Sequence, residues 1–133
     1  MAFQIDMRAA ARRHLQAAEA LAGGHRRDVA GYLFGIAAEC ALKAMMIDAG
    51  LRPSSPPHRR DDPFFAHFPD LRTLLRDALQ GRRGTPLTNY VQNDAFLNNW
   101  STRMRYSHGR DIQDQWIVAW ATQARDAVSA IGT

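Results

Sequence analysis

Apolar residues recur at helical spacing along most of the chain, and no stretch alternates apolar and polar residues as a strand would. In residues 3–22 the apolar positions recur every three or four residues, through Ile5 and Leu15. Residues 27–49 are apolar around most of a helix, which is typical of a helix buried on several sides. Gly23 ends the first stretch and Gly50 the second, because glycine tolerates the conformation that closes helices.

Three further helices are predicted in the second half of the chain. They cover residues 69–81, a short stretch at 94–100, and residues 111–131 with Asp111 as the N-cap. Residues 51–66 are rich in proline and polar residues, which predicts a long loop. The pattern predicts an all-α, up-and-down bundle of four to five helices that forms a single domain over residues 1–133.

Gly31 and Gly35 lie one turn apart in the most apolar helix. Each glycine costs about 1 kcal/mol relative to alanine in a helix interior. Close approach of another element offsets that cost, and the first helix or a second subunit could supply it. Glu39 and Lys43 form a favourable i,i+4 pair on the same helix, and Glu39 would need partners if it were buried.

The chain of 133 residues has a net charge of +4, and Lys43 is the only basic residue that is not arginine. Arginine binds phosphate in bidentate fashion, but a surplus of this size is also common on ordinary surfaces. The one cysteine, Cys40, excludes an intrachain disulfide and is expected to be packed and unreactive. No apolar run reaches the roughly 20 residues that span a bilayer, so we expect a soluble cytoplasmic protein without a membrane partner.

The segment between Trp100 and Asp111 holds Arg103, Arg105 and Arg110 together with Tyr106 and His108. A neutral histidine accepts protons near pH 7, and an adjacent arginine stabilises charge on a phosphate. The combination suits metal-independent RNA cleavage, and equally a solvated basic turn with Tyr106 as a packing anchor. In a continuous helix Arg103 and His108 would lie about 140° apart. Their convergence on one phosphate therefore requires an irregular segment or two subunits.

Candidate metal ligands are His58, Asp61, Asp62 and His67, but these residues lack a compact metal-binding spacing. We expect no metal and no cofactor. His67 is instead expected to cap the helix that follows it or to order the loop.

Several fragments resemble the HEPN (higher eukaryotes and prokaryotes nucleotide-binding) domain family, in its bacterial members. They are Ala18-Ala-Glu-Ala-Leu21, Tyr32-Leu-Phe-Gly-Ile-Ala-Ala-Glu-Cys-Ala-Leu-Lys-Ala44, and His67-Phe-Pro-Asp-Leu71. Arg103 and His108 match the spacing of the ribonuclease motif of that family. The resemblance covers nearly the whole chain. It implies a homodimer in which the arginine–histidine motifs of two subunits meet, with His108 as general base and Arg103 as phosphate clamp.

Two features favour a HEPN-like module that is non-catalytic or weakly catalytic. Met104 stands where active members usually have a polar residue, and Arg105-Tyr106 is similar to the pair found in members without a catalytic motif. Such a module would bind RNA or a nucleotide through Arg105, Tyr106 and Arg110, in a basic cleft at the dimer interface. Two alternatives remain open. One is a metal-independent endoribonuclease toxin paired with a nucleotidyltransferase-type antitoxin, and the other is a structural or partner-binding helical dimer.

Overall fold

The computed structural model is all-helical and describes residues 3–54, 62–79 and 86–132. Five α-helices follow one another along the chain: α1 (Met7–Ala22), α2 (Arg27–Asp48), α3 (Asp70–Ala78), α4 (Pro86–Gln92) and α5 (Asp114–Ser129). Within the described residues, three 3₁₀ turns lie between them: η2 (Pro63–Phe65), η3 (Thr102–Tyr106) and η4 (Gly109–Asp111). The predicted all-α helical bundle is confirmed.

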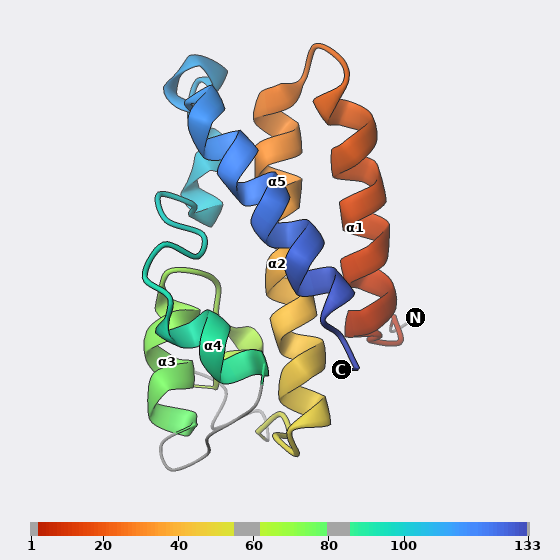
Figure 1. Cartoon of the computed structure of the whole chain (residues 1–133), viewed down its shortest axis with the longest axis vertical. Coiled ribbons are helices and arrows are strands. Elements are labelled where there is room, and N and C mark those ends of the chain that lie inside the picture. The colour runs from red at the N-terminus through yellow and green to blue at the C-terminus, as the bar shows by residue number, and fades with distance from the viewer. Residues whose placement is uncertain (1–2, 55–61, 80–85, 133) are drawn as a thin grey trace.

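α2 is the central helix of the bundle (Figure 1). α1 runs antiparallel beside α2, and α5 crosses α2 at an angle. α3 and α4 lie beside the C-terminal half of α2. By length and composition α2 could cross a membrane, but most of its apolar stretch is buried inside the bundle. Its apolarity is therefore accounted for by its central position, since a helix covered on several sides has no solvated face.

The core is built from small residues between α1 and α2 and large ones elsewhere. Ala11 and Ala18 of α1 are fully buried, which lets the two backbones approach closely. The largest fully buried side chains lie on α2, on α5 and on the segment that joins α4 to α5; they include Trp100, Trp120, Phe34 and Phe96. This connecting segment is thus fastened to the core by aromatic rings.

Several predicted boundaries were wrong for local reasons. α1 begins at Met7 and not at residue 3, because the Asp6 side chain accepts from Ala9 N–H at 2.9 Å and caps the helix there. The predicted N-cap Asp111 instead ends η4, and α5 begins at Asp114 after Gln113. Gly50, with φ of 93°, ends α2 as expected.

The helix predicted at residues 94–100 is a series of turns, and the helix in this region is α4, which precedes it. The Asn93 side chain accepts from Ala95 N–H at 3.0 Å, which competes with helical hydrogen bonding. Leu97 and Asn99 have positive φ values of 53° and 68°, which no right-handed helix allows. Most of the predicted loop at residues 51–66 lies outside the described residues, and its last part contains η2.

Gly31 and Gly35 face neither α1 nor a second subunit, the two candidates suggested by their spacing. A Cβ atom on Gly31 would meet Ile117 and Trp120 of α5 at 3.0–3.2 Å. A Cβ atom on Gly35 would overlap the indole ring of Trp100. The two glycines therefore admit large side chains of the same chain into the surface of α2.

Candidate functional site

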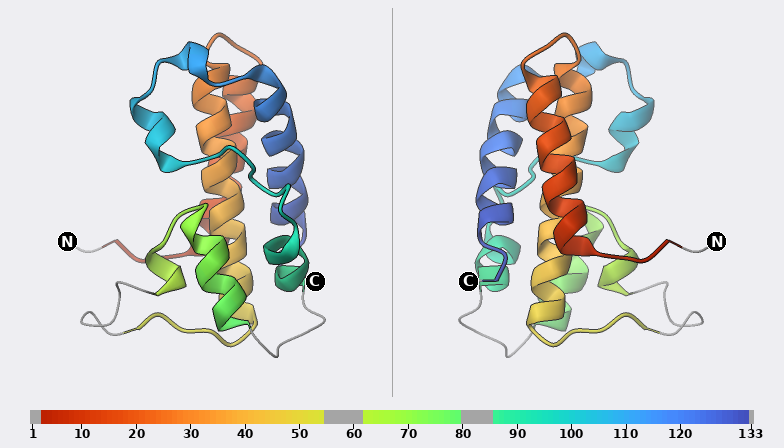
Figure 2. Two further views of the ribbon diagram at one scale, coloured as in Figure 1. Left: turned by 90° about the vertical axis from the view of Figure 1, so that its left-hand side faces the viewer. Right: turned by 90° about the vertical axis from the view of Figure 1, so that its right-hand side faces the viewer.

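The segment from Trp100 to Asp111 folds as two short 3₁₀ turns and not as a continuous helix. Ser101 caps η3 by accepting from Arg103 N–H at 3.2 Å, and Ser107 closes it by donating from its hydroxyl to the Met104 carbonyl at 3.0 Å. Seen from the side, the segment stands out from the layer formed by α1, α2 and α5 (Figure 2). The irregularity that the Arg103–His108 spacing required is present.

The segment is attached to α2 at both ends. At one end Trp100 is 2% exposed; its indole N–H donates to the Tyr32 carbonyl at 3.3 Å and its ring stacks on Tyr32 at 5.9 Å. At the other end Gly109 packs against the Asp28 carboxylate and Arg26, so an added Cβ atom would have to displace the Asp28 side chain. Asp28 in turn is bound by the Arg26 guanidinium, and that hydrogen bond is the main reason why the pKa of Asp28 is lowered.

The candidate functional side chains of the segment point away from the core. Arg103, Arg105, Tyr106, His108 and Arg110 are all exposed, and Tyr106 is 82% exposed. Arg105 donates from Nε to the Thr102 carbonyl at 3.0 Å, which places its guanidinium 5.2 Å from the centre of the Tyr106 ring. Tyr106 therefore does not pack on the core as an anchor, one of the two roles considered from sequence. Trp100 and Gly109 hold the segment instead.

His108 is held by its own backbone. Its Nδ1 atom accepts a hydrogen bond from Arg110 N–H at 3.1 Å and so caps η4. A neutral imidazole that accepts at Nδ1 carries its proton on Nε2. In this arrangement His108 offers a donor to a ligand, and it has to give up the Arg110 bond before it can accept a proton.

Arg103 and His108 line two different hollows of the single chain. The first, which we call the α3 groove, has a volume of about 1020 Å³ and lies between residues 65–74 and residues 97–103, with Arg103 at its edge. The second, which we call the α2 hollow, measures about 630 Å³ and is bordered by residues 25–28, by residues 107–110 and by the start of α5. His108 and Arg110 belong to the α2 hollow. A single chain therefore does not assemble the predicted arginine–histidine pair in one cavity.

A buried polar cluster that the sequence did not predict as a site lies beneath the α3 groove. Glu39 is 2% exposed; one of its carboxylate oxygens lies 2.9 Å from Nδ1 of His67, and the other accepts from Phe68 N–H at 2.6 Å. Burial raises the pKa of Glu39, against the opposing effect of these hydrogen bonds. Lys43, one turn further along α2, is 6% exposed and acts on Glu39 through its charge. Glu39 is thus buried, and it has the partners that a buried glutamate needs.

His67 contributes to the start of α3 in two ways. Its backbone carbonyl accepts from Leu71 N–H at 2.8 Å, and its ring ties the preceding turn to α2 through Glu39. The His67 side chain therefore does not cap α3, whose N-cap is Pro69 without a side-chain hydrogen bond; it ties the chain before the helix to α2. The only sequence signal for the pairing was a glutamate in an otherwise apolar helix, and nothing identified its partner 28 residues away.

Arg72 lies beside this cluster in the α3 groove. Its guanidinium donates to the carbonyls of Asn93 at 3.3 Å and of Phe96, and it lies 5.4 Å from the centre of the Phe68 ring. Burial and the neighbouring Arg76 lower the pKa of Arg72. Its Nη2 amino group is used by both carbonyls, and its Nε atom is buried without a hydrogen-bond partner, so Arg72 contributes positive charge to the groove.

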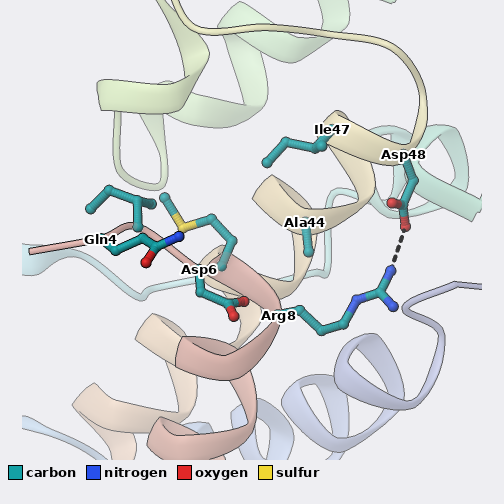
Figure 3. Close-up of a pocket in the computed structure, with 8 residues that line it drawn as sticks. Gln4, Asp6, Arg8, Ala44, Ile47 and Asp48 are labelled. Atoms are coloured by element: carbon teal, nitrogen blue, oxygen red, sulfur yellow. Dashed lines mark hydrogen bonds and ion pairs between the residues drawn. The ribbon is translucent and has the colours of Figure 1, made fainter.

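A third hollow, of about 440 Å³, lies where the N-terminal residues 4–8 pass the end of α2 (Figure 3). Arg8 closes one side of it through an ion pair with Asp48 at 3.3 Å (Figure 3). Asp6 also borders it and is already used as the cap of α1. With one cation and two carboxylates, this hollow has no surplus of positive charge for a phosphate.

The remaining candidates are accounted for as follows. Of the four residues considered for metal ligation, His58 and Asp61 lie outside the described residues, and Asp62 accepts from Phe64 N–H at 2.9 Å. Residues 3–54, 62–79 and 86–132 contain no cluster of three or more metal-ligating side chains. Cys40 is half-buried, and burial raises the pKa of its thiol, which agrees with a packed side chain.

Comparison of the chain with protein-family models, with curated proteins and with solved structures finds no significant match.

Proposed function

We propose that this protein binds single-stranded nucleic acid, specifically RNA, through the exposed segment between Arg103 and Arg110. The observation that carries the proposal is the Tyr106 ring, which is 82% exposed and has the Arg105 guanidinium over it at 5.2 Å. A large aromatic ring held outside the core gains nothing for folding. Proteins that bind single strands use such rings to stack bases, with arginines alongside for the phosphates.

The distribution of ion pairs supports the same surface. Arg8, Arg26, Arg27, Arg76 and Arg125 are each paired with a carboxylate. Within the part of the chain that the structure describes, Arg103, Arg105 and Arg110 form no ion pair. Unpaired arginines clustered beside an exposed ring favour a polyanionic partner, since their charge is not neutralised within the chain.

Binding without cleavage is the form of this function that a single chain supports best. His108 presents a protonated Nε2 atom, and Arg103 lies at the edge of a different hollow. Because the two residues line different hollows, the endoribonuclease alternative is best served by a homodimer that presents Arg103 of one subunit to His108 of the other. A nucleotidyltransferase-type partner would belong to that alternative. A cytoplasmic location suits the free, half-buried Cys40.

The test is binding of a fluorescein-labelled oligouridylate measured by fluorescence anisotropy at two salt concentrations. Stacking on an aromatic side chain contributes about 1–3 kcal/mol per base, so Tyr106→Ala should weaken binding by roughly 5- to 150-fold. Tyr106→Phe should bind as the unmodified protein does, because the ring remains. Arg105→Ala should weaken binding and make it less sensitive to salt.

Arg12→Ala is the matched control, because Arg12 is an exposed arginine of α1 without an ion pair among the described residues. It removes the same charge from a different surface and should change affinity less than Arg105→Ala. Equal affinity of Tyr106→Ala and the unmodified protein would refute the proposal. RNA that is cut in the presence of EDTA, with cutting lost in both Arg103→Ala and His108→Ala, would instead support the endoribonuclease.

A further inference from the structure

The α3 groove is lined by apolar residues together with neutral polar residues and a few charged ones. His67, Arg72 and Arg103 border it, and Asp70 is the only carboxylate among its described lining residues. In the side views, η2 and η3 lie on the same side of α2, with the entry to α3 below the segment that carries Arg103 (Figure 2). The groove therefore continues from the proposed nucleic-acid surface toward His67.

The two sides of the His67 ring have different surroundings. Nδ1 lies 2.9 Å from a Glu39 carboxylate oxygen that is buried in the protein, whereas the side chain as a whole is 51% exposed. An ionised carboxylate only accepts, so Nδ1 carries the proton of that hydrogen bond. Nε2 lies on the opposite edge of the ring from Nδ1, and His67 is one of the residues that border the groove. This arrangement is the reverse of that at His108, where Nδ1 is the acceptor.

Because Glu39 holds the Nδ1 proton, a second proton on the ring enters at Nε2. In neutral His67 the Nε2 atom carries a lone pair, which cannot donate a hydrogen bond to a phosphate oxygen. In protonated His67 the Nε2 atom carries an N–H donor, and the ring is positively charged. One proton therefore converts this edge of the groove from an acceptor to a donor.

We propose that the α3 groove binds a phosphate group through Arg103 and protonated His67, so that binding takes up one proton. This inference rests on the proposed function, because the phosphate belongs to the bound strand. Arg103 is exposed, and no ion pair within the described residues occupies its guanidinium. Arg72 adds positive charge to the groove while its Nη2 amino group stays bonded to backbone carbonyls.

The charged groups around His67 explain why a bound phosphate favours the protonated ring. On α2, Glu39 favours the protonated ring and Lys43 opposes it; on α3, Asp70 favours it and Arg72 opposes it; on η3, Arg103 opposes it. Asp62, which precedes η2, is engaged by backbone N–H groups of Phe64 and Ser54. Groups of both signs therefore surround the ring. An added phosphate supplies the negative charge that makes protonation favourable.

The experiment is isothermal titration calorimetry of the full chain with hexauridylate between pH 6 and pH 8, in two buffers of different protonation enthalpy. The unmodified protein should take up close to one proton on binding at the alkaline end. Its affinity should fall by up to tenfold per pH unit there, since one proton is linked to binding. His67→Gln keeps a side-chain amide that can bond to Glu39 but cannot titrate, and should remove both effects. Arg103→Gln should weaken binding at every pH and leave the proton uptake.

His108→Gln is the matched control, because it removes an exposed histidine of the neighbouring segment and should leave the proton uptake unchanged. A parallel titration with inorganic phosphate identifies the source of the ligand: proton-linked binding of phosphate alone indicates a small-anion site, and binding of hexauridylate only indicates a site for a chain phosphate. The same proton uptake in His67→Gln as in the unmodified protein would overturn the inference. Oligonucleotide binding without proton uptake refutes it and leaves the proposed function standing, whereas no binding at any pH refutes both.

Discussion

Gly35 is the position at which α2 receives the indole ring of Trp100, and Gly35→Ala tests whether that contact holds the functional segment in place. A Cβ atom built on Gly35 lies well under 3.0 Å from three atoms of the ring. The indole is 2% exposed, stacks on Tyr32 and bonds to a backbone carbonyl, so it has little freedom to retreat. The added methyl group and the ring cannot occupy this space together.

The expected magnitude follows from two opposing effects. Alanine in place of a mid-helix glycine stabilises a helix by about 0.5–1 kcal/mol. Expulsion of a buried tryptophan costs about as much as its truncation, roughly 3–5 kcal/mol. We therefore expect Gly35→Ala to lower the free energy of unfolding by about 2–4 kcal/mol, a large part of the roughly 5–15 kcal/mol typical of a domain.

The assay is urea unfolding followed by circular dichroism and by tryptophan fluorescence. Gly31→Ala is a matched control on the same helix, since a Cβ atom there meets Ile117 and Trp120 at 3.0–3.2 Å and a small shift relieves the contact. It should change stability by less than 1 kcal/mol, because the gain in helix propensity offsets that shift. A Gly35→Ala variant as stable as the unmodified protein, or more so, would show that the indole is not seated against α2 as described.

Two further predictions concern titration. Burial raises the pKa of Glu39, so the folded chain binds more protons than the unfolded chain just above the ordinary range of glutamate, and stability should fall as the pH rises through that window. Urea unfolding at a series of pH values should show this fall in the unmodified protein and not in Glu39→Gln; parallel curves for the two would contradict it. Burial and a hydrogen bond to Asp126 at 2.9 Å raise the pKa of Tyr90 to about 12, so the stability that depends on the Tyr90 proton should be lost as the pH rises from 10 toward 12. The late phenol ionisation should be visible by absorbance at 295 nm and absent from Tyr90→Phe, and its persistence in that variant would assign it to another tyrosine.

Periodicity predicted the long helices because a helix that packs against a core has to show its apolar residues at helical spacing. Residues 27–49 were assigned almost to their ends, and Gly50 marked the close of α2. The short elements were not predictable in the same way. Phe96, Leu97 and Trp100 are apolar and buried, yet they reach the core from turns, so their spacing imitates a helix that does not exist.

The residues of the candidate site were found by composition, but their arrangement was not. Sequence drew attention to the arginines, Tyr106 and His108, all of which are exposed. It did not indicate that Arg103 and His108 face different hollows, or that Glu39 pairs with His67. Both facts depend on tertiary contacts between distant parts of the chain, which a local pattern does not encode. The hydrogen bond that orients the His67 ring depends on such a contact as well, whereas that of His108 is local.

The two attachments of the functional segment, Trp100 at one end and Gly109 at the other, separate the demands of folding from those of recognition. Between them, Arg103, Arg105, Tyr106 and His108 contribute almost nothing to the buried core. Met104, by contrast, is partly buried against the core and belongs with the attachments. The exposed side chains can therefore be replaced, and the chemistry of this surface changed, without disturbing the packing of the bundle, as long as Trp100, Met104 and Gly109 remain.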